Sequence, residues 1–117
     1  MNAEEFARAQ VDAAAGKLVD LSHRIHQTPE LGFEEIHASA WIADLLDSAG
    51  YTVASEICDI PTALSAESGS GPLCVAICAE YDALPGIGHA CGHNIIAAAA
   101  VGAALALKPV ADDIGVT

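Results

Sequence analysis

The sequence has very little positive charge. Only Arg8, Lys17, Arg24 and Lys108 are basic among 117 residues, whereas sixteen are acidic, and the formal net charge is −12. No basic residue lies between positions 25 and 107, a span that carries ten acidic residues. Nucleic acids and anionic membrane surfaces are both recognised through basic patches. We therefore expect neither nucleic acid nor a membrane as a partner.

Long apolar runs are also missing. The longest one, Ile95 to Leu107, has thirteen residues, whereas a membrane-spanning helix needs about 20. The first ten residues contain no basic end followed by an apolar run, so no secretory signal is predicted. The resulting expectation is a soluble protein in the cytoplasm.

The sequence lacks paired-cysteine motifs. Its four cysteines form no CxxC pair; they are Cys58, Cys74, Cys78 and Cys91. Cysteines of cytoplasmic proteins are usually reduced, and we expect the same here. Because Cys74 and Cys78 lie within an apolar run, we expect them to be buried as small hydrophobic side chains.

The apolar content is sufficient for a core. Hydrophobic residues make up 53% of the chain, and no repeat or linker divides it, so residues 1–117 are read as part of one domain. Apolar residues at helical spacing predict three helices, and shorter segments predict two weak strands. The predicted helices cover residues 3–27, 34–49 and 93–107, and the weak strands cover residues 51–57 and 62–67.

A continuous apolar run, Leu73 to Ala79, predicts a central strand. Such runs are typical of strands buried on both faces, as in a parallel sheet with helices on each side. The predicted fold class is therefore α/β, with a parallel or mixed sheet and helices on both faces. Strand alternation places Glu80 and Asp82 together at the carboxyl end of this strand, the edge at which open α/β sheets bind ligands.

Chemically reactive side chains concentrate directly after this strand, in the stretch EYDALPGIGHACGHN from Glu80 to Asn94. If the segment is extended, His89, Cys91 and His93 point to the same side. Imidazole and thiolate are the ligands that Zn²⁺ and neighbouring metals prefer. Glu80 and Asp82 are then either oxygen ligands or partners that orient a histidine. The pattern favours a metal site.

Other interpretations of this stretch remain open at the level of chemistry. Cys91 lies close to His93 and near a predicted helix start, an arrangement that also suits a nucleophilic thiol. His89 is equally compatible with a loop histidine bonded to the backbone. The chain is also compatible with a small metal-binding or partner-binding module that has no catalytic activity.

Two segments carry a resemblance to a known family. PELGFEE from Pro29 to Glu35 and AEYDALPGIGHACGHN from Ala79 to Asn94 resemble the N-terminal part of the M20 metallopeptidase/amidohydrolase family. The nearest branch is M20D, and within it the aminoacylase-like and dipeptidase-like members. The resemblance covers nearly the whole chain, and its second motif is specific.

The resemblance implies a fold and a reaction. The fold would be the N-terminal part of a zinc-peptidase-like α/β catalytic domain, with a twisted sheet normally interrupted by a small lid and dimerisation domain, in a homo-oligomeric enzyme. The family holds one or two divalent ions, most often Zn²⁺ or Mn²⁺. It hydrolyses the amide bond of N-acyl amino acids or dipeptides, so the expected partner is a small-molecule substrate.

The resemblance also implies roles for individual residues. Cys91 and His93 match the cysteine and histidine metal ligands of the family's CGH motif, and Asp82 matches the catalytic-site aspartate that supports them. Asn94 stands where much of M20D has aspartate, and Glu80 stands where other branches have a metal-binding histidine or another acid. The roles of Glu80, His89 and Asn94 therefore stay undetermined.

The family mechanism needs further groups. In the family, a metal-bound water, whose pKa the metal lowers to about 7, gives its proton to a glutamate of a paired Glu-Glu motif downstream of CGH. No such motif follows within this sequence. We therefore expect residues 1–117 alone to be inactive. We also expect them to associate through unpaired edges and apolar faces, chiefly through the apolar helix from Ile95 to Leu107.

Overall fold

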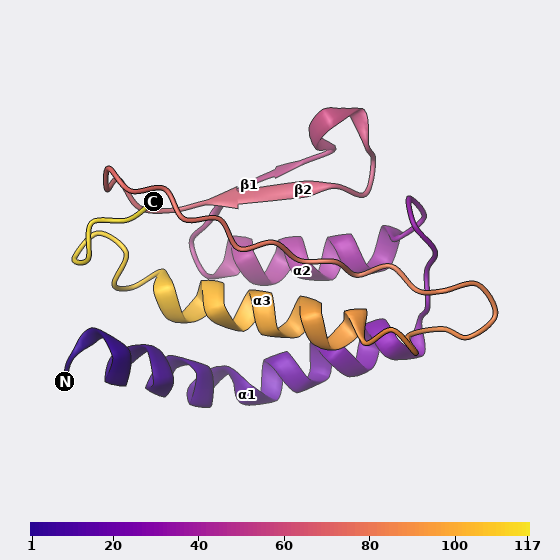
Figure 1. Cartoon of the computed structure of the whole chain (residues 1–117), viewed down its shortest axis with the longest axis horizontal. Helices are drawn as coiled ribbons and strands as arrows, with labels where there is room; N and C mark the ends of the chain where they lie inside the picture. The colour runs from indigo at the N-terminus through magenta and orange to yellow at the C-terminus, as the bar shows by residue number, and fades with distance from the viewer.

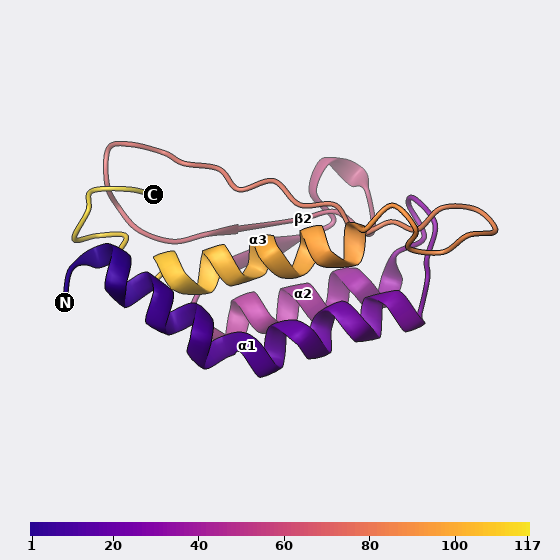
Figure 2. The ribbon, with the colours of Figure 1, turned by 60° about the horizontal axis from the view of Figure 1, so that its bottom comes forward.

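The computed structural model describes all 117 residues and contains three long helices and one β-hairpin. The order along the chain is α1 (Ala3–Gln27), α2 (Ile36–Ser48), β1 (Thr52–Ser55), a short 3₁₀ helix (Ile57–Asp59), β2 (Leu64–Glu67) and α3 (His93–Leu107). Figure 1 shows the helices running side by side, with the hairpin above α2. A long extended segment then crosses over the helices before α3 begins, as the turned view in Figure 2 also shows.

Helix α1 begins with a capping box. The Asn2 side chain accepts a hydrogen bond from the Glu5 amide at 2.8 Å, and the Glu5 carboxylate accepts one from the Asn2 amide at 2.9 Å. Two amides that would lack partners at the helix start are thereby satisfied. Only Leu21 and Ile25 of this helix are fully buried, so α1 contributes a narrow apolar stripe near its C-terminal end.

The core lies between the three helices. Helices α1 and α3 pack most closely, because a Cβ atom at Gly102 would lie only 2.9 Å from Cδ1 of Leu18. Glycine at this position therefore permits the close approach. Tyr51, just after α2, donates a hydrogen bond at 2.7 Å to the carbonyl of Ala104 in α3. The buried core cluster comprises Leu21, Ile25, Ala38, Ile42, Leu46, Ala97 and Val101.

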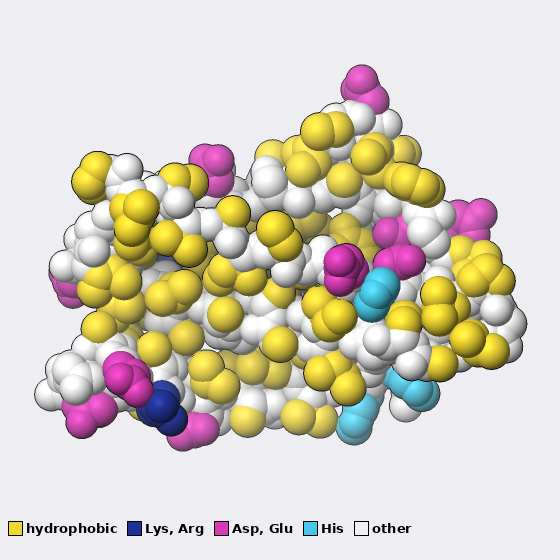
Figure 3. All heavy atoms as spheres, viewed as in Figure 1, with side chains coloured by type: hydrophobic (Ala, Val, Ile, Leu, Met, Phe, Trp, Pro, Cys, Tyr) yellow, Lys and Arg dark blue, Asp and Glu magenta, His cyan; other side chains and the backbone are white.

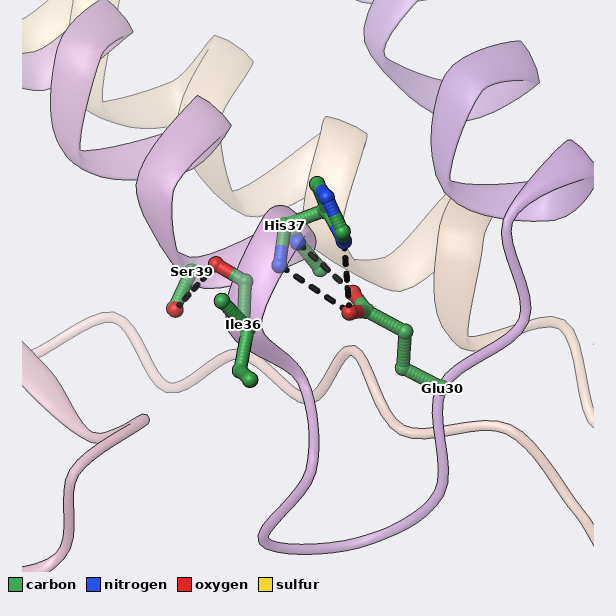
Figure 4. A network of polar contacts seen from close by, with 5 residues as sticks. Glu30, Ile36, His37 and Ser39 are labelled. Atoms are coloured by element: carbon green, nitrogen blue, oxygen red, sulfur yellow. Dashed lines mark hydrogen bonds and ion pairs between the residues drawn. The ribbon is translucent and has the colours of Figure 1, made fainter.

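The first turn of α2 is capped by a carboxylate that lies several residues before the helix. The residue at its N-cap, Glu35, makes no capping hydrogen bond with its side chain. Instead, the Glu30 carboxylate accepts hydrogen bonds from the amides of His37 and Ala38 at 3.0 and 2.9 Å, and it lies 3.1 Å from Nδ1 of His37. Figure 4 shows this network.

The electrostatics of Glu30 follow from these contacts. Burial by itself raises the pKa of this carboxyl, but the hydrogen bonds from His37 and Ala38 outweigh it, so the pKa lies below 4.5. The ionised carboxylate therefore fixes the path of the turn from Pro29 to Phe33 into α2.

The α/β class and the three predicted helices are confirmed, and α3 has the predicted bounds. The sheet differs from the expected parallel or mixed one with helices on both faces. It has two antiparallel strands, with Thr52 opposite Glu67 and Ser55 opposite Leu64. Parallel pairing occurs only as two isolated bridges, between Leu31 and Ala83 and between Leu73 and Val116.

The prediction of a buried central strand at Leu73–Ala79 is wrong. This segment is extended, but none of its residues belongs to a strand or is buried. A central strand needs neighbours on both edges, and here β2 pairs only with β1. The expected burial of Cys74 and Cys78 is wrong for the same reason, since both thiols are exposed. All four cysteines are free.

Helix α3 is buried on one face only. Its buried residues include Ala97, Val101 and Ala106, whereas Ile95 is 65% exposed and Ile96 is 38% exposed. The helix is therefore not the main unpaired apolar surface; the segment from residue 73 to 79 exposes more. No helix in the chain is both long and apolar enough to cross a bilayer.

Candidate metal centre

The loop between the extended segment and α3 is attached to the turn before α2. The amide of Ala83 donates a hydrogen bond to the carbonyl of Glu30 at 2.7 Å, and Leu31 forms a parallel bridge with Ala83. An added Cβ at Gly32 would lie 3.9 Å from the Asp82 carboxylate. The two sequence segments that carry the family resemblance therefore lie against each other in space.

A left-handed glycine sets the turn into α3. Gly92 has φ of 79° and occupies the N-cap position, a conformation that other residues adopt at a cost. Its amide donates to the carbonyl of His89 at 3.0 Å, and its carbonyl accepts from the amides of Ile95 and Ile96. This turn brings Cys91 and His93, on either side of it, back toward the end of the extended segment.

Asp82 orients the imidazole of His93. Nδ1 of His93 lies 2.8 Å from Oδ1 of Asp82 and 2.9 Å from the Asp82 carbonyl oxygen. Both oxygens accept hydrogen bonds, so Nδ1 carries the proton and a neutral ring offers its lone pair at Nε2. A carboxylate behind a histidine is the usual way in which proteins orient a metal-binding imidazole. Nε2 lies 3.9 Å from the Glu80 carboxylate.

The thiol of Cys91 contacts the same residue. Its Sγ lies 3.8 Å from the Asp82 carbonyl oxygen, and the side chain is partly buried. The structure thus brings together Asp82, Cys91 and His93, the three residues selected from the sequence, and Asp82 contacts both of the others. Glu80 is the next carboxylate, and 64% of its side chain is exposed.

The donor atoms suit a divalent metal in kind but are too few to enclose one. A thiolate and an imidazole are preferred by Zn²⁺ and its neighbours. A catalytic zinc usually takes three protein ligands, and no group of three or more His, Cys, Asp and Glu side chains is arranged to hold an ion. Cys91 and His93 alone supply two candidate donor atoms, fewer than a catalytic zinc site uses.

His89 is a buried histidine beside this centre. Its residue exposure is 7%, and neither ring nitrogen has a hydrogen-bond partner. Burial lowers the pKa of His89, and the nearby His26 and His93 lower it further, against the opposing effect of Asp82. The ring centroids of His26 and His89 are 6.4 Å apart. Sequence reasoning did not connect His26 with the loop, and no spacing signal could have done so.

Several curated proteins are similar in sequence to this chain over most of the chain's length. No family model matches the chain. It is 40% identical to the Xaa-Arg dipeptidase of Mus musculus, over 92% of this chain and 27% of the relative. It is 34% identical to one of the subunits of p-aminobenzoyl-glutamate hydrolase from Escherichia coli (strain K12), over 88% of this chain and 25% of the relative. It is 32% identical to N-acetyl-L-cysteine deacetylase of Bacillus subtilis (strain 168), over 90% of this chain and 29% of the relative.

The chain belongs to the M20 family of peptidases and amidohydrolases. The resemblance stated from the sequence is confirmed, and the chain spans about a quarter of the length of the curated relatives it matches.

One departure from the M20D pattern has a structural explanation in this M20 chain. Asn94, which replaces the more usual aspartate, is buried. Its Nδ2 donates a hydrogen bond to Oγ of Ser22 at 3.0 Å and approaches the Ser22 carbonyl at 3.5 Å. An aspartate has no hydrogen to donate to that carbonyl. Asn94 therefore ties the first turn of α3 to α1, a contact that sequence reasoning missed.

A mostly apolar cavity of about 760 Å³ lies beside the centre. Tyr81 and Glu35 line it, and the Tyr81 hydroxyl donates a hydrogen bond to the carbonyl of Thr62. Burial raises the pKa of Tyr81, and the charge of Glu35 raises it further. Figure 3 shows acidic side chains and a histidine gathered among hydrophobic side chains on this face of the molecule.

Proposed function

We propose that residues 1–117 supply part of the active centre of a metal-dependent amidohydrolase that cleaves the amide bond of N-acyl amino acids or dipeptides. The observation that carries the proposal is the contact set of Asp82 with Cys91 and His93. The names of the relatives support it, because a dipeptidase, a p-aminobenzoyl-glutamate hydrolase and an N-acetyl-L-cysteine deacetylase all act on amides.

Each residue of the centre has a defined part in this proposal. Cys91 and His93 hold a divalent ion, Zn²⁺ or Mn²⁺, through Sγ and Nε2. Asp82 keeps the proton of His93 on Nδ1, so the lone pair of Nε2 is left to bind the ion. A divalent ion in such a site supplies Lewis acidity and lowers the pKa of a bound water to about 7.

The complete protein is proposed to be a cytoplasmic homo-oligomer that acts on small molecules. The isolated residues 1–117 are proposed to be inactive, because two donors do not make a catalytic metal site. Robust turnover of an N-acyl amino acid by residues 1–117 would contradict that part of the proposal. Release of a free amine from N-acetylated amino acids and dipeptides, measured with added Zn²⁺ or Mn²⁺, tests it.

The alternative of a nucleophilic Cys91 finds less support in the geometry. A thiol nucleophile needs a base within hydrogen-bond reach, but Nδ1 of His93 is engaged by Asp82, and the Cys91 thiol contacts a backbone carbonyl. A covalent acyl adduct on Cys91 after incubation with an activated ester would favour this alternative over metal ligation.

Calorimetric titration with Zn²⁺ tests the proposed ligands. The double variant Cys91→Ser/His93→Ala should bind Zn²⁺ at least 100-fold more weakly than the unmodified chain. A matched control is Cys58→Ser/His23→Ala, which also removes one thiol and one imidazole, both exposed. The control should bind normally. Equal losses in the two double variants, or no loss in either, would contradict the assignment.

A further inference from the structure

Asp82 lies at the end of a segment that makes almost no hydrogen bonds. From residue 76 to residue 82, no amide and no carbonyl takes part in a backbone hydrogen bond. The only hydrogen bond made by residues 76 to 81 comes from a side chain, that of Tyr81. A segment with so few hydrogen bonds needs other contacts to hold it in place. The position of the carboxylate that orients His93 therefore depends on the contacts of its neighbours.

Two hydrogen bonds attach the residues on either side of Asp82 to other parts of the fold. Before it, the hydroxyl of Tyr81 donates to the carbonyl of Thr62. After it, the amide of Ala83 donates to the carbonyl of Glu30 at 2.7 Å. Thr62 is buried in front of β2, and Ala83 is itself buried. Asp82 is thereby held between the hairpin and the turn before α2.

The hydroxyl of Tyr81 is suited to this attachment. A phenol has one hydrogen to donate, and here the carbonyl of Thr62 accepts it. Burial raises the pKa of Tyr81, and the charge of Glu35 raises it further. The hydroxyl therefore keeps its proton and remains a donor in neutral and mildly alkaline solution.

The contact between Asp82 and His93 is sensitive to the placement of the Asp82 backbone. Nδ1 of His93 donates to two oxygens of the same residue, the Asp82 carboxylate at 2.8 Å and the Asp82 carbonyl at 2.9 Å. A displacement of about 1 Å is enough to break such hydrogen bonds. The hydrogen bond at one ring nitrogen determines which nitrogen carries the proton. If Asp82 moved, Nε2 would be protonated in part of the molecules and would have no lone pair for a metal.

We propose that Tyr81 is a positioning residue for the metal centre: its hydrogen bond to Thr62 fixes Asp82, and Asp82 in turn holds His93 in the tautomer that leaves Nε2 free. This inference rests on the proposed function, in which Nε2 of His93 binds the ion. Tyr81 acts on that atom only through Asp82, so it supplies no ligand and no proton of its own.

The tautomer of His93 tests the proposal without any metal. In mildly alkaline solution, the ¹⁵N chemical shifts of the ring report which nitrogen carries the proton. The unmodified protein should show the proton on Nδ1 in nearly all molecules, whereas Tyr81→Phe should show a mixture of the two tautomers. Tyr51→Phe is the matched control, because it also removes a hydroxyl that donates to a backbone carbonyl, that of Ala104. The control should leave the His93 tautomer unchanged, and both variants should keep the helical circular dichroism of the unmodified protein.

Zinc affinity, measured by calorimetric titration, tests the same path. Tyr81→Phe should bind Zn²⁺ roughly fivefold more weakly, about the effect of one hydrogen bond, whereas Tyr51→Phe should bind normally. Because Tyr81 acts through Asp82, the loss should be smaller when Tyr81→Phe is combined with Asp82→Asn. A residue that only stabilises the fold would lower the affinity by the same factor in both backgrounds.

The two measurements separate this proposal from the proposed function. If Zn²⁺ does not bind to Cys91 and His93, the proposed ligands are wrong, but the tautomer of His93 still decides the role of Tyr81. Three results would overturn the proposal: an unchanged His93 tautomer in Tyr81→Phe, equal tautomer changes in Tyr81→Phe and Tyr51→Phe, or an undiminished loss of zinc affinity in the Asp82→Asn background.

Discussion

The helical layer and the extended segment at residues 73–79 differ in how deeply they bury large apolar side chains. In the helices, Leu21 and Ile25 are completely buried against neighbouring helices. In the extended segment, Leu73, Val75 and Ile77 are 62%, 50% and 44% exposed. Residues 73–79 are apolar throughout and α1 is not, so the difference arises from the neighbours that each segment meets and not from its apolar content. A helix satisfies its own backbone, whereas a strand needs another strand.

The two regions also differ in what their polar groups do. At the helices and their ends, Asn2, Glu30 and Asn94 are held by hydrogen bonds that complete helix ends and helix contacts. After the extended segment, Asp82 positions His93 so that Nε2 faces away from its hydrogen-bond partner. The helices form a scaffold, and the loop at their end carries the proposed metal ligands.

The largest difference in stability is expected between two leucine-to-alanine variants, one in the helical core and one in the extended segment. Leu21→Ala should lower the free energy of unfolding by about 3 kcal/mol, because it opens a cavity in the core. Leu73→Ala removes the same atoms from an exposed position and should cost about 0.5 kcal/mol or less. Urea unfolding of both variants measures the difference, and similar losses would show that the segment is packed in solution.

The next effect concerns the support of the metal ligand. Asp82→Asn should lower Zn²⁺ affinity by about 10-fold to 100-fold, the usual effect of removing a carboxylate behind a metal-binding histidine. Asp44→Asn on the exposed side of α2 is the matched control and should leave the affinity unchanged. If the Asp82→Asn variant bound Zn²⁺ as tightly as the unmodified protein, Asp82 would have no role in supporting the proposed metal ligand.

A smaller effect is expected at the start of α2. Glu30→Gln should destabilise the protein by about 1 kcal/mol at neutral pH, because a charged cap of two amides becomes a neutral one. Glu34→Gln, at an exposed neighbouring position, should change stability much less. Thermal unfolding of both variants measures the difference.

The pH dependence of stability gives a second measure of Glu30. Its pKa in the folded protein lies below 4.5, so the unfolded state binds its proton first as the pH falls. The stabilisation is complete above the ordinary value of 4.5 and is lost as the pH falls through the lower folded value. The Glu30→Gln variant should therefore lose less stability than the unmodified protein on acidification below pH 4.5.

The smallest effect is expected on the outer face of α1. Arg8 pairs with Glu4 at 2.9 Å, and both side chains are about three-quarters exposed. Arg8→Ala should cost roughly 0.3 kcal/mol at low salt, and less at high salt. Lys17→Ala, which breaks no ion pair in the structure, provides the baseline. A loss near 1 kcal/mol would show an additional packing role.

The sequence predicted what is determined locally. Helix α3 has the predicted bounds because its propensities and its start at Gly92 depend on nearby residues. Asp82, Cys91 and His93 meet as the motif suggested, since all three lie within twelve residues of one another. The strand at Leu73–Ala79 was predicted from apolar content, but content does not provide a pairing partner.

Contacts between distant residues could not be predicted from the sequence. Glu30 caps a helix that starts six residues later. The one sequence signal for this contact was a carboxylate upstream of a helix start that has no capping residue of its own. Ser22 meets Asn94, and His26 meets His89, only because α1 folds back beside the loop. Such pairs depend on tertiary packing, which spacing along the chain does not reveal.

Two-dimensional amide NMR during a Zn²⁺ titration tests the central claim most directly. The account predicts that zinc perturbs amides from Tyr81 to Asn94, leaves β1 and the N-terminal half of α1 unchanged, and has no such effect in the Cys91→Ser/His93→Ala variant. Perturbations centred on the exposed thiols of Cys58, Cys74 or Cys78, or identical changes in the double variant, would contradict it.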